Sequence, residues 1–396
     1  MKQTKTIVSD LKSVFGRDKV LMILLSVLFF SSLETYHSYI RLFFVFLAIL
    51  SGRFWKYSDG LALWLLFFST TYGLGLFLNS NIDAGTNFLG YLFCPIVFYL
   101  FGKKIVAKSS SNSELTSFLL LCILLFGLKV YLITLSDISQ GILISLSRLE
   151  ETDTTSATLL SATVSLGMVG LSAFGAFVNP VKNFKSWLYA LIFFMSILAA
   201  THQISRTGVV IGFLVTIMFY VYKSRHHLLL LIFLLSLGLY VVWQLSIFEF
   251  FNNEVLEAYV SRMDDYDQSM GDDGGRIYRW SYALDKMVNN LGGWSTTEFV
   301  FVHNFWLDVQ KVAGILPLFS LLVVTILSYK NQILLLLFKE DNSFVTISFG
   351  INVCMLLTSF VEPILQGNAT YIYFMFMLWG MQAQYLTSYN HIETNE

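Results

Sequence analysis

Long runs of apolar residues recur along almost the whole chain, and they constrain its fold more than any other feature. Many are long enough, at 1.5 Å per residue in a helix, to cross the roughly 30 Å hydrocarbon layer of a bilayer. The runs are continuous rather than alternating, which excludes a membrane β-barrel. Only 13% of the residues are charged, whereas a soluble domain carries about 25%. The sequence therefore predicts an all-α, polytopic transmembrane helix bundle.

About twelve membrane spans are predicted, in two groups. Nine fall within residues 1–246 and three within 305–396, and a long polar interval, 247–304, separates them. The predicted spans are 18–33, 38–52, 60–79, 87–102, 115–135, 157–178, 184–201, 206–222, 227–246, 305–328, 343–361 and 370–388.

Basic residues predict the orientation of the bundle, because cytoplasmic loops of membrane proteins are enriched in Lys and Arg. With the N-terminus in the cytoplasm, the loops on that side hold most of the 25 basic residues, whereas 79–86 and 362–369 on the other side hold none. Both termini are therefore expected in the cytoplasm. The 247–304 interval is expected to be an extracytoplasmic loop.

Most of the basic residues predicted on the outer side are arginines, whereas those on the cytoplasmic side are mainly lysines. A guanidinium presents a planar fork that matches phosphate and carboxylate groups. Arg148, Arg206, Arg276 and Arg279 are therefore candidate ligands for an anionic group. The alternative for each is an interfacial side chain that reaches the lipid headgroups.

The outer loop contains a pattern typical of an amphipathic helix near 276–291. It begins after "DDGG" (272–275), ends at Gly292–Gly293, and is expected to lie on the membrane surface or across the mouth of the bundle. Arg276 borders the apolar stripe, and Arg279 is predicted to point away from it. The stripe consists of Ile277, Trp280, Leu284, Met287, Val288 and Leu291.

Three outer positions are candidates for chemistry. Arg206 lies at a very tight turn between two predicted spans, near the level of a lipid-linked pyrophosphate. His303 begins the tenth predicted span, where the helix N-terminus favours a neutral ring that accepts a proton. Glu362, at a turn with no basic neighbour in the sequence, is expected to bind a sugar hydroxyl or to act as the base itself. The structural alternatives are an anchoring arginine, an interfacial histidine and a solvated loop carboxylate.

Other patterns narrow the possible functions. Asp308 and Lys311 follow His303 at helical spacing and are expected to pair with each other, or to contact substrate through Lys311. Gly208 and Gly212 form a GxxxG pair, which predicts a close helix contact. The sequence contains no P-loop, nucleophile elbow or nucleotide-binding pattern, which argues against an ATP-driven machine and a nucleotide-sugar enzyme. Neither a metal site nor a nucleic-acid partner is predicted.

The spans, the long outer loop and two motifs together resemble the O-antigen polymerase and O-antigen ligase family of bacterial surface-glycan assembly. The motifs are "ISRTGVV" (204–210) and "HNFWLDVQKVAG" (303–314). By this resemblance, Arg206 is the arginine after a small hydroxyl residue, Arg276 opens a periplasmic helix, and His303–Asn304 is a His-Asn pair.

The resemblance implies a GT-C-like, metal-independent membrane glycosyltransferase without a cofactor. It would sit in the bacterial inner membrane and use an undecaprenyl-pyrophosphate-linked oligosaccharide as donor and a glycan as acceptor. Its further expected partners are a chain-length regulator and a flippase. We expect three catalytic and five substrate-binding residues: His303, Arg206 and Arg276, and then Arg279, Asn304, Glu362, Arg148 and Lys311.

Two alternatives to a polymerase of O-antigen or capsular repeat units remain open. Ligases of the family have Gly, Thr or Tyr where this chain has Pro317, so this position favours polymerase over ligase. A flippase would also have about twelve spans, but its charges are expected near the midplane. Here the charges are predicted to crowd the outer face, which favours an enzyme.

Overall fold

The computed structural model describes residues 55–79, 84–109, 111–142, 157–173, 184–203, 205–223, 276–294, 302–338, 342–364 and 369–393. Within these ranges the regular secondary structure is entirely helical. The helices are η1 (Trp55–Tyr57), α4 (Gly60–Asn79), α5 (Ala84–Lys108), α6 (Asn112–Ser139), α7 (Ala157–Ala173), α8 (Phe184–His202), α9 (Arg206–Lys223), α13 (Arg276–Asn289), α14 (Phe305–Ala313), α15 (Ile315–Phe338), α16 (Ser343–Val361) and α18 (Ala369–Glu393).

Five helices in the described part of the chain are long and apolar enough to cross a bilayer, namely α4, most of α5, α6, most of α15, and α16. The fold is therefore that of a helical membrane protein, as the apolar runs predict. The predicted spans 60–79 and 343–361 coincide with α4 and α16. The spans predicted at 18–33, 38–52 and 227–246 lie outside the described residues, so the total of about twelve stays a prediction.

The predicted tenth span, 305–328, is wrong in its bounds, because two helices meet inside it. α14 ends at Ala313 and α15 begins at Ile315. Gly314 between them has a φ of +89°, which L side chains rarely adopt. A Cβ at this position would also meet the main chain of Leu291 and Gly292. The short α14 is therefore a separate element that precedes the span.

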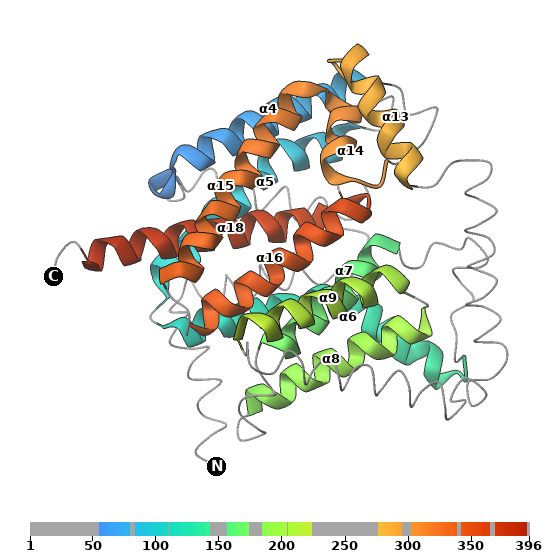
Figure 1. Cartoon of the computed structure of the whole chain (residues 1–396), viewed down its shortest axis with the longest axis vertical. Coiled ribbons are helices and arrows are strands. Elements are labelled where there is room, and N and C mark those ends of the chain that lie inside the picture. The colour runs from blue at the N-terminus through green and yellow to red at the C-terminus, as the bar shows by residue number, and fades with distance from the viewer. Residues whose placement is uncertain are drawn as a thin grey trace.

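The helices run in alternating directions, so their ends gather at two opposite ends of the bundle (Figure 1). At one end, which we call the inner end, Tyr385 of α18 donates to Asn112 of α6 (2.9 Å) and also bonds Asn342 before α16. At the other, the outer end, Ser161 of α7 bonds Glu362, which follows α16. The compartments that the two ends face stay predictions.

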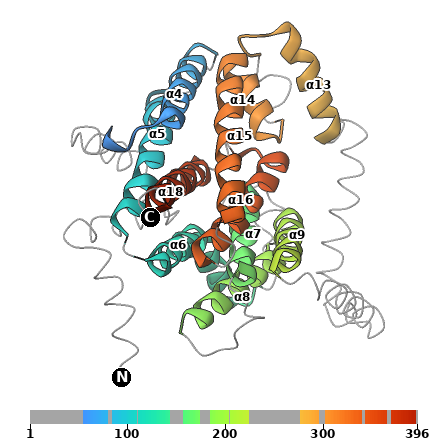
Figure 2. The same ribbon diagram turned by 60° about the vertical axis from the view of Figure 1, so that its left-hand side comes forward.

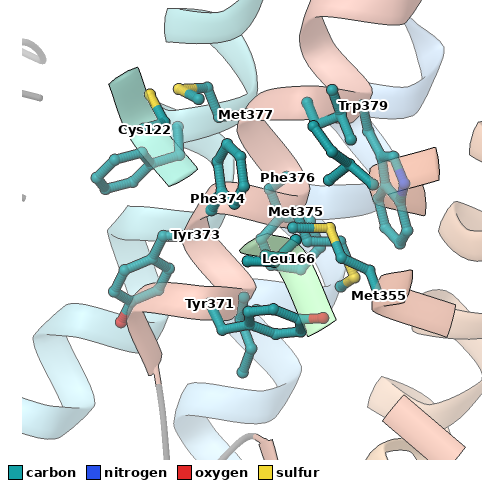
Figure 3. Packing of buried hydrophobic residues seen from close by; sticks show 14 of the residues in the cluster. Cys122, Leu166, Met355, Tyr371, Tyr373, Phe374, Met375, Phe376, Met377 and Trp379 are labelled. Carbon is teal, nitrogen blue, oxygen red and sulfur yellow. The ribbon is translucent and has the colours of Figure 1, made fainter. Parts of the chain in front are cut away.

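The centre of the bundle is the crossing of α18 and α5, where two glycines allow very close contact. A Cβ on Gly102 would meet the main chain of Met377, and one on Gly380 would meet that of Tyr99. Lipid chains are as apolar as leucine, so close van der Waals packing of this kind holds membrane helices together. Figure 3 shows the buried side chains packed around α18, among them Phe374 and Trp379.

The GxxxG pair of α9 forms the predicted close helix contact. Gly208 lies against Ser161 and Val164 of α7, and Gly212 lies against Met168. This prediction is confirmed. The contact also sets the start of α9 beside Ser161 at the outer end.

The amphipathic helix predicted near 276–291 is α13, which ends two residues earlier at Asn289. It lies beside α14 at the edge of the bundle and crosses the direction of α15 (Figures 1 and 2). The predicted apolar stripe divides in two: Trp280 and Met287 are half-buried, whereas Ile277, Leu284 and Val288 are exposed. Leu291 is exposed as well, so four of the six stripe residues face away from the bundle.

Candidate functional site

The turn that carries His303 is shaped by the residues that follow it. Asn304 caps α14 by accepting a hydrogen bond from the Leu307 amide (3.2 Å). The Asp308 carboxylate accepts from the Val302 amide (2.8 Å) and the Asn304 amide (3.3 Å). These bonds satisfy main-chain donors at the start of the helix. His303 between them has a φ of 60°, a left-handed conformation that this residue type adopts more readily than most.

Asp308 is fully buried, and this burial raises its pKa from 3.8 to about 6. The Val302 amide, the charge of Lys311 and the Asn304 amide act in the opposite direction. Lys311 is also buried, and its ammonium lies 5.4 Å from the ring centre of Trp294. The predicted interaction between Asp308 and Lys311 is therefore electrostatic, and both groups belong to the interior that supports the turn.

A clamp of hydrogen bonds fixes the end of α13 to α14. The Trp294 indole donates to the Gln310 side chain (3.0 Å), and Gln310 donates in turn to the Asn290 carbonyl (3.0 Å). Asn79, the last residue of α4, donates to the carbonyls of Gly292 (2.8 Å) and Val312 (3.0 Å). These contacts hold α13 in one position relative to the His303 turn.

Arg276 and Arg279, one turn apart on α13, are both half-buried at the outer end. Burial and the charges of these two arginines lower the pKa of His303 from 6.5 to about 4. The imidazole is therefore neutral at pH 7, as the sequence predicts. The main cause is burial, followed by the charges of Arg276 and Arg279, whereas the sequence argument relied on the helix N-terminus.

Glu362 is not the solvated loop carboxylate that its sequence context allows, because its side chain is only 4% exposed. Its Oε1 atom lies 3.7 Å from Nη2 of Arg276 and accepts a hydrogen bond from the Ser161 hydroxyl (3.3 Å). The absence of a basic neighbour holds only along the sequence. In the fold, Arg276 comes from α13, far from Glu362 in the chain.

The structure thus brings together Arg276, Arg279, His303 and Glu362, four of the predicted site residues. Asn304 caps α14, and Lys311 is a buried cation of the same helix. Arg206 opens α9, next to Ser205, which is buried at the α7–α9 contact. The Arg206 side chain and the whole of Arg148 lie outside the described residues.

Sequence reasoning missed several polar residues at this end. Ser161, which contacts Glu362, lies in an apolar run with no motif around it. His202, which ends α8, bonds Asp137 of α6 through Nε2 (3.0 Å), and Gln203 bonds Thr134 (3.3 Å). These contacts tie the turn before Arg206 to α6. The sequence offers one indication of these contacts: polar residues of different predicted spans occur at the same predicted depth in the membrane.

The described residues contain no group of three His, Cys, Asp or Glu side chains close enough to hold a metal ion. Among the described side chains, two guanidiniums and a carboxylate converge at the outer end beside a neutral imidazole. Such a set suits an anionic ligand with a hydroxyl close by.

Fold and site together define a helical membrane protein with a polar cluster at one end of its bundle. Neither the comparison with protein-family models nor that with curated proteins finds a match for this chain.

Proposed function

We propose that this protein is a membrane glycosyltransferase that polymerises undecaprenyl-pyrophosphate-linked oligosaccharide repeat units into O-antigen or capsular polysaccharide. The observation that carries the proposal is the convergence of Arg276, Arg279, His303 and Glu362 beside the end of a membrane bundle. A lipid-linked diphosphate sugar has its charged group at this depth, and its acceptor is a sugar hydroxyl.

In the proposed reaction, Arg276 and Arg279 bind the donor diphosphate, together with Arg206 as the resemblance implies. The acceptor hydroxyl loses its proton to a base, and its oxygen forms a bond to the anomeric carbon. The bond between that carbon and the phosphate oxygen breaks, and undecaprenyl pyrophosphate leaves. Fixed guanidiniums stabilise the charge that develops on the leaving group. A single displacement inverts the anomeric carbon.

His303 is the first candidate for the base, and donor binding would improve it. In the free protein the arginine charges help to hold its pKa near 4, which makes the imidazole a weak base. A bound diphosphate would offset those charges and raise the pKa, while burial, the larger cause, still holds it below 6.5. The base would thereby strengthen only when the donor is present.

Glu362 is the second candidate for the base. Its carboxylate is buried and lies 3.7 Å from the Arg276 guanidinium. A diphosphate that drew Arg276 away would leave this carboxylate available to accept the proton of the acceptor hydroxyl. Parallel His303→Ala and Glu362→Gln variants separate the two, because loss of the base removes turnover while donor binding remains. Unchanged glycan length in a well-expressed His303→Ala protein would rule out His303.

The decisive experiment supplies purified protein with synthetic lipid-linked repeat units. A polymerase yields a ladder of glycans still attached to undecaprenyl pyrophosphate, whereas the alternative, an O-antigen ligase, yields product only when lipid A–core is added. Arg276→Gln should abolish the ladder, and Lys286→Gln, another cation of α13, is the matched control. Turnover in detergent without a sealed bilayer excludes a pure flippase. Folded protein that gives no product with either acceptor contradicts the proposal.

A further inference from the structure

Helix α13 has three faces that meet three different surroundings. Trp280, Ala283 and Met287 face the bundle, with Ala283 fully buried. Ser281 and Asp285 are exposed polar residues on another side. Between these two faces runs a third, which is apolar and exposed.

The third face consists of Ile277, Leu284 and Val288, which we call the outer stripe. Their exposed fractions are 79%, 49% and 72%. At about 3.6 residues per turn, the three side chains point within about 40° of one another. Leu291, just beyond the helix, continues the stripe and is 62% exposed. Water would be a costly environment for so much apolar surface in one line.

The depth of α13 follows from what its end is tied to. Leu291 accepts a hydrogen bond from the amide of Ile315 (2.8 Å), where a membrane span begins, and Asn79 at the end of another span bonds Gly292. Leu78 and Leu316, beside these two attachment points, are exposed apolar side chains of the spans themselves. The outer stripe therefore continues the apolar surface that the bundle presents to lipid.

We propose that α13 lies at the boundary between lipid headgroups and acyl chains, in the membrane leaflet at the outer end of the bundle. The outer stripe is then immersed among the acyl chains. Ser281 and Asp285 then face water, and the arginines of the same helix stay toward the bundle. This arrangement is a surface for lipid, rather than for another protein, because the stripe is continuous with the spans. It goes beyond the proposed function and does not depend on it.

The test uses single cysteines labelled with an environment-sensitive fluorophore, in nanodiscs that hold one copy of the protein. The native Cys94, Cys122 and Cys354 are buried, so background labelling is low. Val288→Cys is the test position, Asp285→Cys the water-facing control, and Ile326→Cys in the middle of α15 the lipid-facing control. Quencher-bearing lipids report contact with acyl chains directly.

We expect the label at Val288 to emit at shorter wavelength than the label at Asp285, and to be quenched by the modified lipids as strongly as the label at Ile326. Equal, water-like emission at Val288 and Asp285 would overturn the proposal. Protection of Val288 that arises only in discs with two copies would also overturn it, because the stripe would then face a second protein molecule. A label at Leu284 gives an independent reading, so one poorly folded variant does not decide the result. None of these readings depends on glycosyl transfer.

Discussion

The two ends of the bundle each contain an ion pair, and the two pairs differ in their separation. At the inner end, Lys103 of α5 lies 2.5 Å from Asp59, which also accepts from the Tyr99 hydroxyl (2.8 Å) and the Ala62 amide (2.8 Å). At the outer end, Arg276 and Glu362 are 3.7 Å apart.

The exposed partner also differs. At the inner end Lys103 is the buried partner (6% exposed) and Asp59 is 33% exposed, whereas at the outer end the Arg276 side chain is 35% exposed and its carboxylate partner is the buried group. The inner pair is closed around its cation and suits a structural role. The outer pair leaves part of a guanidinium accessible, next to a second arginine and a neutral imidazole. Exposure of the cation rather than of the carboxylate therefore distinguishes the proposed binding pair from the inner pair better than the presence of a charge pair does.

The largest effect should come from exchanging the cation of each pair for a neutral residue. Arg276→Gln removes a group proposed to stabilise the leaving diphosphate, so turnover should fall on the order of a hundredfold or more. Lys103→Gln should leave turnover within about twofold but lower the thermal unfolding temperature, because Asp59 loses its partner. Turnover assays and thermal melts in detergent measure both. Equal loss of turnover in the two variants would erase the proposed difference between the ends.

Asp308→Asn should disturb the outer site by weakening the hydrogen bonds that support the His303 turn. An amide can accept only one of the two main-chain hydrogen bonds, so the His303 turn loosens and turnover should fall on the order of tenfold or more. The folded-state pKa of Asp308 is raised to about 6, so its contribution to stability is present below pH 3.8 and is lost as the pH rises through 6. The variant should not show this loss of stability between pH 4 and 7, which thermal melts at several pH values measure. Asp285→Asn, an exposed carboxylate of α13, serves as control and should change neither measurement.

The helical membrane character of the fold follows from the sequence, because burial in lipid requires continuous apolar helices, and the bounds of α4 and α16 coincide with predicted spans. The break at Gly314 does not follow, since a glycine inside an apolar run looks the same whether it packs or turns. The burial of Glu362 also escapes sequence reasoning, because Ser161 and Arg276 reach it from distant parts of the chain. Residue type alone was enough to name Arg276 and His303 as candidate site residues. Their burial and their neighbours could be known only from the three-dimensional structure.

Arg279→Gln should test how the arginine charges at the outer end affect the pKa of His303. Burial, the charge of Arg276 and, third, the charge of Arg279 lower the pKa of His303 to about 4, so removing the Arg279 charge should raise that pKa part of the way toward 6.5. If His303 is the base, the acid limb of kcat/KM moves to higher pH by up to about one unit. Lys286→Gln should not move it. An unshifted acid limb in Arg279→Gln would mean that the limb belongs to another group.

Ser161→Ala should have the smallest effect. It removes one hydrogen bond to Glu362 and is expected to lower turnover about two- to fivefold, in line with a net contribution near 1 kcal/mol. Ser165→Ala is the matched control, because that hydroxyl bonds the Ser161 carbonyl within the same helix (2.8 Å). If the two variants have the same turnover, the hydrogen bond from Ser161 to Glu362 does not contribute to function.

The most direct test of the central claim is photo-crosslinking with an undecaprenyl-pyrophosphate-linked sugar that carries a reactive group beside the diphosphate. The account predicts crosslinked peptides from the start of α13 and from the His303 turn, competed away by unlabelled donor and weakened in Arg276→Gln. Crosslinks that map to the inner end around Lys103, or that unlabelled donor does not displace, would contradict it.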